Sequence, residues 1–139
     1  MAADKQFDLE IICPDRVFFR GKASMIELNT TEGFVGIYKR HIPMTMILEP
    51  GLVYIKDGDG QRVAALHEGF IEILPEKISI MAEAAEWPEE IDLNRAEEAR
   101  IRAERRMQTQ DPNINVARAE MALHRALVRI EASHKRGQQ

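Results

Sequence analysis

The sequence lacks the usual signals of secreted, disulfide-bonded and membrane-spanning proteins. Its single cysteine, Cys13, excludes an internal disulfide and suits a reducing compartment, where we expect it to be a small buried residue in a strand. No run approaches the roughly 18 apolar residues that a membrane span requires. The opening MAADKQFDLE contains no apolar segment of the kind found in a secretory signal. We therefore expect a globular protein of a reducing cytosol.

Motifs for catalysis and metal binding are also missing. There is no G-x-S-x-G or Walker-type G-x-x-x-x-G-K sequence, and no H-x-x-x-H pair. The formal net charge is −4, which argues against nucleic-acid binding by the chain as a whole. We expect neither an independent enzyme activity nor a metal site. The histidines are scattered, at His41, His67, His124 and His134.

The composition changes near Trp87-Pro88, which predicts two domains, 1–87 and 88–139. Nearly all the glycine and most of the β-branched and aromatic residues precede this point, whereas alanine, arginine and glutamate dominate after it. Charge follows the same division, with a balance of −5 before Trp87 and +1 from there on. The chain therefore consists of an acidic part with strand-like patterns and a nearly neutral part with helix-like patterns.

The first part contains many short strand patterns and no helical segment. FDLEI alternates, with Phe7, Leu9 and Ile11 on one face. This arrangement predicts an antiparallel β-sandwich or flattened barrel and not a parallel sheet, because no crossover helix is available. Turn chemistry separates the expected strands at Pro14-Asp15, Arg20-Gly21-Lys22, Thr31-Glu32-Gly33, Glu49-Pro50-Gly51 and Asp57-Gly58-Asp59-Gly60.

The second part predicts two helices, over about 92–108 and 114–133. Asp92 is the expected cap of the first, and Asp111-Pro112-Asn113 separates them, with Asn113 as the expected cap of the second. So short a link predicts an antiparallel hairpin, which makes the whole chain an α+β protein. The expected apolar stripe consists of Ala96, Ala99, Ala103 and Met107, then Val116, Ala119, Leu123, Ala126, Leu127 and Ile130.

Alanine dominates this stripe, and each alanine buries little area. The hairpin is therefore expected to be weakly held, both to itself and to the strand domain. A marginal element on a firm domain is what a conformational switch requires. The alternative, that the hairpin packs and stays in place, remains open at this point.

The stretch IDLNRA, at 91–96, introduces a set of arginines with regular spacing. Arg95 and Arg102 lie two turns apart on one helix, and Arg125 and Arg129 one turn apart on the other. Guanidinium groups bind phosphates, and carboxylates such as Asp92 accept hydrogen bonds from a ribose or an amine. By spacing alone, an exposed surface with the ion pairs Glu98–Arg102 and Glu97–Arg100 is favoured over a site.

Three longer stretches carry a resemblance to a known family. They are FDLEIICPDRVFFRGKA, TTEGFVGIYKRHIPMTMILEPGLVYI and HEGFIEILPEKISIMAEAAE, followed by the helical hairpin. In order, spacing and turn residues the chain resembles the epsilon subunit of the F-type ATP synthase, with a bacterial origin favoured and a plastid one left open. It departs from the family at Phe34, at Tyr38-Lys39-Arg40, where Pro-Gly is common, and at Glu68-Gly69, where two glycines are common.

The resemblance implies a non-catalytic rotor subunit at the cytoplasmic face of the bacterial membrane, held there only through its complex. Its sandwich would clamp the gamma subunit and rest on the ring of c subunits, while an extended hairpin would block ATP hydrolysis by contacting the catalytic beta and alpha subunits. The implied ring contacts are Glu32, His41, Ile42, Pro43 and Thr45. The implied inhibitory contacts are Arg118, Arg125 and Arg129.

The resemblance also gives IDLNRA a meaning that spacing alone does not. Some bacterial members bind ATP between the folded hairpin and the sandwich through a signature of Ile or Leu, Asp, two free positions, Arg and Ala. No cofactor is required, and ATP would be a regulatory ligand that favours the folded hairpin. A freestanding nucleotide-binding module and a purely structural coupling subunit are the alternatives. The implied ATP-binding residues are Glu86, Ile91, Asp92, Arg95, Ala96, Arg102, Arg125 and Arg129.

Overall fold

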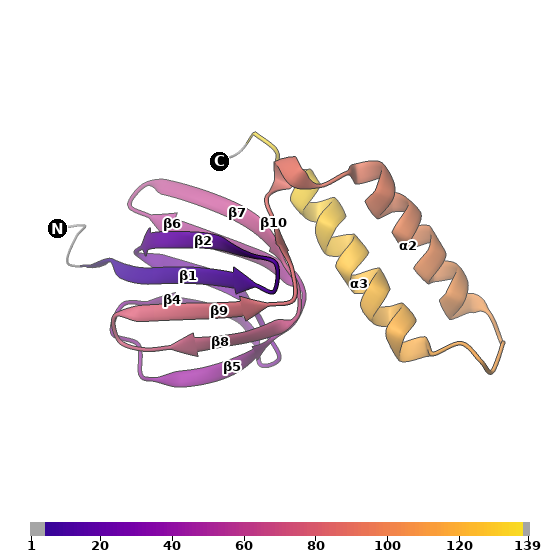
Figure 1. Cartoon of the computed structure of the whole chain (residues 1–139), viewed down its shortest axis with the longest axis horizontal. Helices are drawn as coiled ribbons and strands as arrows, with labels where there is room; N and C mark the ends of the chain where they lie inside the picture. Colours follow the sequence, from indigo (N-terminus) through magenta and orange to yellow (C-terminus); the bar gives the residue numbers. More distant parts are fainter. Residues whose placement is uncertain (1–4, 138–139) are drawn as a thin grey trace.

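The structure is a computed structural model that describes residues 5–137, in which a β-sandwich is followed by an antiparallel two-helix hairpin (Figure 1). This confirms the predicted fold class. The elements are β1 (Phe7–Cys13), β2 (Arg16–Ala23), β3 (Met25–Thr30), β4 (Gly33–Tyr38), β5 (Met44–Leu48), β6 (Gly51–Asp57), β7 (Gly60–Leu66), β8 (Gly69–Ile73), β9 (Lys77–Ala82), β10 (Ala85–Glu86), the 3-10 turn η1 (Pro88–Glu90), α2 (Leu93–Gln108) and α3 (Val116–Ser133).

The strands form one continuous hydrogen-bonded sheet in the order β10-β7-β6-β3-β5-β8-β9-β1-β2, with β4 paired to β3. All pairs are antiparallel except β1 with β9, where Asp8–Ile12 run parallel to Lys77–Met81. The described sheet is therefore antiparallel, as predicted, apart from this one pair. The chain returns to β1 through seven intervening strands, β2 to β8, so this parallel pair needs no crossover helix.

The sandwich core follows the alternation seen in the sequence. Phe7, Leu9 and Ile11 of β1 are buried, and the intervening carboxylates lie on the other face. Asp8 pairs there with Lys22 at 2.7 Å. Cys13 is also buried, as expected. The side chains that fill the interior come from both layers and include Ile26, Leu28, Ile37, Leu48, Val53, Ile71, Ile73, Ile78 and Ile80.

Turn chemistry was predicted correctly at some positions and wrongly at one. Asp57–Gly60 forms the β6–β7 hairpin, and Gly58 there has a φ of +61°, which favours glycine. Gly21, by contrast, lies inside β2, which continues from Arg16 to Ala23. A Cβ at Gly21 would lie 3.2 Å from the ring of Phe19, so this glycine makes room for the ring instead of forming a turn.

Both helices begin at capping residues. The Asp92 carboxylate accepts a hydrogen bond from the Arg95 backbone N–H at 3.2 Å, which confirms it as the cap of α2. The cap of α3 is Asn115, which accepts from the Arg118 N–H at 3.1 Å. The expected cap Asn113 was wrong, because its own N–H donates to Asp111 and closes a turn before the helix.

The two helices meet along small side chains, with Ala96, Ala103, Ala119 and Ala126 buried. Two members of the predicted stripe were wrong: Val116 is 50% exposed and Leu127 is 46% exposed. The reason is that α3 presents a different face to the sandwich. Its apolar contact there is the cluster of Leu52, Val63, Ala65, Ile91, Val128 and Ala132. Within residues 5–137, neither helix is long and apolar enough to cross a membrane.

Candidate functional site

A cleft of about 290 Å³ lies where the end of the sandwich, the start of α2 and the middle of α3 meet. Ile91, which is almost fully buried, packs with α3 and the sandwich and so fixes the start of α2 beside them. The structure brings together every residue of the predicted ATP-binding set except Arg125. The lining residues are Glu86, Glu90, Ile91, Asp92, Arg95, Ala96, Ala99, Arg102 and Arg129.

Arg95 and Arg102 supply positive charge to this cleft. Both side chains are exposed, and neither forms an ion pair with another residue of the described range 5–137. The Glu98–Arg102 pair predicted from spacing is not formed, whereas Arg100 bonds to Glu97 at 3.0 Å and to Glu104 at 2.6 Å. The carboxylates Glu97 and Glu104 of α2 therefore pair with Arg100, outside the cleft, and leave Arg95 and Arg102 inside it available for an anion.

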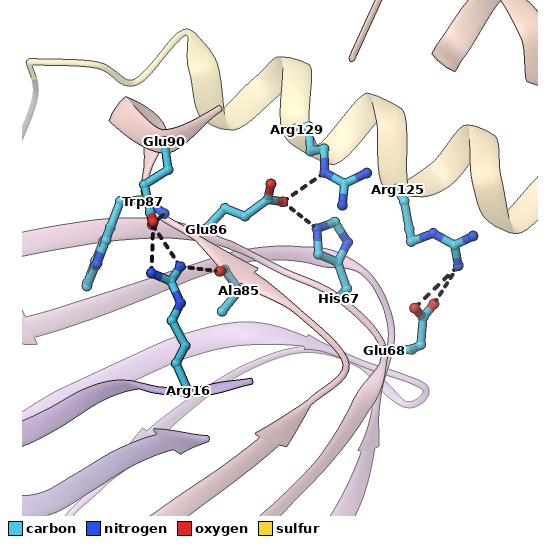
Figure 2. Close-up of polar contacts among 9 residues, drawn as sticks. All are labelled: Arg16, His67, Glu68, Ala85, Glu86, Trp87, Glu90, Arg125 and Arg129. Atoms are coloured by element: carbon cyan, nitrogen blue, oxygen red, sulfur yellow. Dashed lines mark hydrogen bonds and ion pairs between the residues drawn. The ribbon is translucent and has the colours of Figure 1, made fainter. Parts of the chain in front are cut away.

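Glu86 is the main carboxylate of the cleft, and one of its oxygens has two partners (Figure 2). Its Oε1 accepts from Arg129 Nε at 2.8 Å and contacts His67 Nε2 at 3.0 Å. Although burial opposes ionisation, the hydrogen bonds from His67 and Arg129 and the charge of Arg129 lower the pKa of Glu86 to about 2. Glu86 is therefore an anion at neutral pH that holds α3 to the end of the sandwich.

His67 was not among the predicted site residues. Its side chain is 0% exposed, and its Nδ1 has no hydrogen-bond partner among the described residues. Because the Glu86 carboxylate can only accept, the ring proton of neutral His67 belongs on Nε2. The only signal in the sequence is a histidine directly after the apolar run of β7, which indicates burial but gives no partner.

Arg125 lies outside the cleft and pairs with Glu68 at 3.2 Å, next to the Arg129–Glu86 pair on the same face of α3 (Figure 2). These two pairs connect α3 to the sandwich. All four side chains are about one-quarter to one-third exposed, so each pair contributes only about 1 kcal/mol or less. Glu68 is one of the positions at which the sequence departs from the family pattern.

Further contacts fix the segment between the two domains. Arg16 of β2 donates to Glu90 at 2.8 Å and to the Ala85 carbonyl at 3.0 Å (Figure 2). Trp87 stacks on Phe18 with ring centroids 4.3 Å apart, and the guanidinium of Arg62 lies 3.7 Å above its ring. The linker is therefore firmly attached to the sandwich, and any movement of the hairpin has to begin after it.

The last turn of α3 also meets this linker. Arg136, which follows the helix, donates to the Pro88 carbonyl at 2.9 Å and to the Ile91 carbonyl. The two ends of the hairpin are thus tied to one place, near η1. The tip of the hairpin, at 109–115, has no such attachment to the sandwich in the described residues.

The predicted ring contacts are not brought together. Glu32 lies in the β3–β4 turn, whereas His41, Ile42, Pro43 and Thr45 follow the other end of β4. Thr30 pairs with Gly33 at the first end, and Met25 pairs with Tyr38 at the second, so one full strand separates the two groups. Ile42 is 71% exposed.

The predicted inhibitory contacts also differ in their surroundings. Arg118 is exposed in the first turn of α3, and its backbone N–H takes part in the helix cap. Arg125 and Arg129 are partly buried in their ion pairs with the sandwich. Only a hairpin that leaves the sandwich would expose the three guanidinium groups together.

Two family models cover nearly the whole chain. Residues 6–88 match the beta-sandwich domain of the ATP synthase delta/epsilon chain, and residues 89–134 match its long alpha-helix domain. Among curated proteins, the ATP synthase epsilon chain of Clostridium novyi is 42% identical over 128 residues, which cover 91% of this chain and 97% of that protein. The epsilon chain of Halalkalibacterium halodurans is 39% identical over 126 residues, with coverages of 90% and 95%.

Solved structures agree on the fold. A chain of the Euglena gracilis mitochondrial ATP synthase, in a structure of its OSCP, F1 and c-ring, superposes with a TM-score of 0.80 at 23% identity, covering 93% of this chain and 81% of that one. A chain from the central stalk and c-ring of the Tetrahymena thermophila mitochondrial enzyme superposes with a TM-score of 0.58 at 13% identity. On the matched domains and the bacterial relatives, the chain belongs to the ATP synthase delta/epsilon family, as a non-catalytic accessory subunit.

Proposed function

We propose that this protein is the central-stalk epsilon subunit that couples rotation of the c ring to the catalytic head of a bacterial F-type ATP synthase. Family membership over both domains supports this role. The sandwich would bind the gamma subunit and rest on the ring through the loop at His41 to Thr45, since Glu32 lies at the other end of β4. The subunit would lie at the cytoplasmic face of the membrane and be held there by the complex.

We further propose that the hairpin is a mobile inhibitor of ATP hydrolysis. Its attachment to the sandwich is small: two partly exposed ion pairs, one apolar cluster and the contacts of Arg136 near η1. The alanine seam between α2 and α3 adds little buried area. In the extended form, Arg118, Arg125 and Arg129 would meet acidic segments of the beta and alpha subunits.

ATP would control this movement by binding the docked form. The observation that carries this proposal is that Arg95 and Arg102, which form no ion pair within residues 5–137, line the same cleft as Asp92 and the Glu86–Arg129 pair. The two arginines would bind the phosphates, and the carboxylates would accept from the ribose or the adenine amine. A ligand that binds only the docked form stabilises it by about 2.7 kcal/mol when its free concentration is 100 times Kd.

The direct test is calorimetric titration of the whole chain with ATP, comparing Arg95→Ala with Arg105→Ala. Both arginines are exposed on α2, but only Arg95 lines the cleft. We expect saturable binding that Arg95→Ala abolishes and Arg105→Ala preserves. Absence of binding at millimolar ATP, or an equal loss of ATP binding in the two variants, would mean that Asp92 is only a helix cap and Arg95 only a surface charge.

A fixed hairpin is the second candidate, and the Arg125–Glu68 and Arg129–Glu86 pairs favour it, because they attach α3 directly to the sandwich. Truncation after Glu90 separates the two functions. If the hairpin is a brake, the truncated subunit should raise ATP hydrolysis by the assembled enzyme. Unchanged hydrolysis would indicate a purely structural subunit. Failure to copurify with gamma would instead indicate a freestanding nucleotide-binding module.

A further inference from the structure

A second cleft, of about 420 Å³, lies at the end of the sandwich away from the hairpin. This is the end where β1 begins and where β6 turns into β7, opposite the helices (Figure 1). Four cations line it, and no carboxylate among residues 5–137 does. Met25 and Tyr38 also line it, and its cationic residues are Lys5, Lys39, Arg40 and Lys56.

Backbone hydrogen bonds fix the shape of this basic cleft. Met25 pairs with Tyr38 on one side and with Lys56 on the other, so these residues form a row across three strands. The Ser24 N–H and hydroxyl both donate to the Lys56 carbonyl, at 2.8 and 3.1 Å. The turns that border the cleft are therefore tied together in the folded chain.

Arg40 is fixed in an uncommon conformation. Its φ is 66°, in the left-handed region that few residues other than glycine adopt. Its N–H donates to the Pro75 carbonyl at 2.7 Å, which joins the β4–β5 loop to the β8–β9 turn. A strained backbone that is held by a long-range hydrogen bond positions this cation at the rim of the cleft.

Two carboxylates beside the cleft have partners among the described residues. Glu27 pairs with Lys56 at 2.5 Å, and Asp57 accepts from the Gln6 amide at 2.9 Å. Asp59 and Glu76 are exposed on the turns at this end, outside the lining. The two loops that Arg40 connects also carry exposed apolar side chains, Ile42 at 71% and Leu74 at 43%. Cations around a hollow and apolar side chains beside it are together typical of a surface that meets a membrane interface.

We propose that this end of the sandwich binds anionic phospholipid, with a headgroup phosphate in the basic cleft and Leu74 against the boundary of the acyl chains. The orientation toward a membrane rests on the proposed ring contact, because the loop of His41 to Thr45 lies at this same end. The charge and shape of the cleft do not depend on that contact. The contact would hold the edge of the subunit against the bilayer beside the ring.

The test is flotation of the whole chain with phosphatidylcholine vesicles, with and without phosphatidylglycerol. We expect binding only when phosphatidylglycerol is present. Because the net charge of the chain is −4, general electrostatic attraction to an anionic surface is not expected, and binding has to come from a local site. Binding to both kinds of vesicle, or to neither, would overturn the proposal.

Two double variants localise the binding. Lys39→Glu with Arg40→Glu should weaken it by at least about tenfold, since each cation near an anionic surface contributes several-fold. Arg105→Glu with Arg106→Glu makes the same change of charge on exposed positions of α2 and should leave binding unchanged. Equal loss in both double variants would show that only net charge matters and would overturn the site.

Two more measurements distinguish the source of the anion. Calorimetry with glycerol phosphate should show no binding at concentrations at which the vesicles bind; binding to it without binding to vesicles would indicate a site for a small anion. Copurification of the Lys39→Glu, Arg40→Glu variant with gamma and the ring should be preserved. If the wild-type chain does not bind vesicles and the double variant fails to copurify with gamma and the ring, the cleft would be a contact for a protein partner. Normal assembly without vesicle binding would overturn the lipid contact alone.

Discussion

Arg129 of the second helix donates to Glu86 at the end of the sandwich over 2.8 Å, and this pair closes one side of the cleft that faces Arg95 and Arg102. The same contact therefore serves two purposes: it holds the hairpin in place and it forms part of the wall of the proposed ATP site. A ligand in the cleft would strengthen the attachment of the hairpin to the sandwich. Movement of the hairpin away from the sandwich would break the Arg129–Glu86 pair and open the cleft.

Glu86→Gln should weaken docking of the hairpin, because it removes a charge that two donors share and leaves Arg129 unpaired. Because this pair is partly exposed, we expect the loss to be about 1 kcal/mol. Hydrogen exchange of the α3 amides should become faster in this variant, and exchange in β1 and β9 should not change. As a control, Glu89→Gln changes an exposed carboxylate of η1 that does not line the cleft and should leave α3 as it is. Unchanged α3 exchange in Glu86→Gln would contradict the role given to this pair.

The pKa of Glu86 predicts how that effect depends on pH. Its value in the folded chain is about 2, below the ordinary 4.5, so its contribution to stability is fully present above pH 4.5 and is lost as the pH falls toward 2. The difference in unfolding free energy between wild type and Glu86→Gln should therefore shrink between pH 4.5 and pH 2. Urea unfolding of both proteins across that range measures it. Comparing the two removes the contributions of the other carboxylates, and a constant difference would rule out this linkage.

Two adjacent residues of α3 test which face meets the sandwich. Val128 is buried in the cluster with Leu52 and Ile91, whereas Leu127 is 46% exposed. Val128→Ala should destabilise the docked hairpin by roughly 1–2 kcal/mol, and Leu127→Ala should change little although it removes more atoms. Thermal unfolding followed by circular dichroism compares them. A larger effect at Leu127 would mean that α3 is rotated relative to the structure.

Gly69 tests the packing where β8 meets β9. A Cβ at this position would lie 1.9 Å from the Met81 carbonyl oxygen, and backbone cannot yield as a flexible side chain does. Gly69→Ala should therefore cost about 3 kcal/mol or more. At Gly60 the nearest atom would be 3.4 Å away, so Gly60→Ala should be nearly neutral. Similar unfolding midpoints for the two variants would contradict this packing.

Local patterns predicted much of the fold. The alternation of Phe7, Leu9 and Ile11 correctly predicted the buried face of β1, and Asp92 correctly predicted the start of α2. Both features depend only on residues that are close in the sequence. The parallel pairing of β1 with β9 was missed, since it depends on how the chain closes on itself. The exposure of Leu127 was missed because two helix faces compete for the same residues, and only the docking angle decides between them.

The candidate site was predictable to a similar degree. The IDLNRA signature and the spacing of the arginines named most of the cleft, and the structure places those side chains around it. His67 and Glu68, which complete the attachment of α3, could not be named. Their partners lie 19 and 57 residues away in the chain, and no local pattern indicates such pairings.

The central claim is that ATP holds the hairpin against the sandwich. It is tested most directly by the distance between fluorophores on Asn113→Cys, at the tip of the hairpin, and Glu49→Cys, an exposed position next to Pro50 at the end of the sandwich that meets α3, in the full chain assembled into its complex. The native Cys13 is buried and should not be labelled. We predict a short distance at high ATP that lengthens as ATP is removed, and no dependence on ATP in Arg95→Ala. A distance that stays the same with and without ATP in the wild type would contradict the claim.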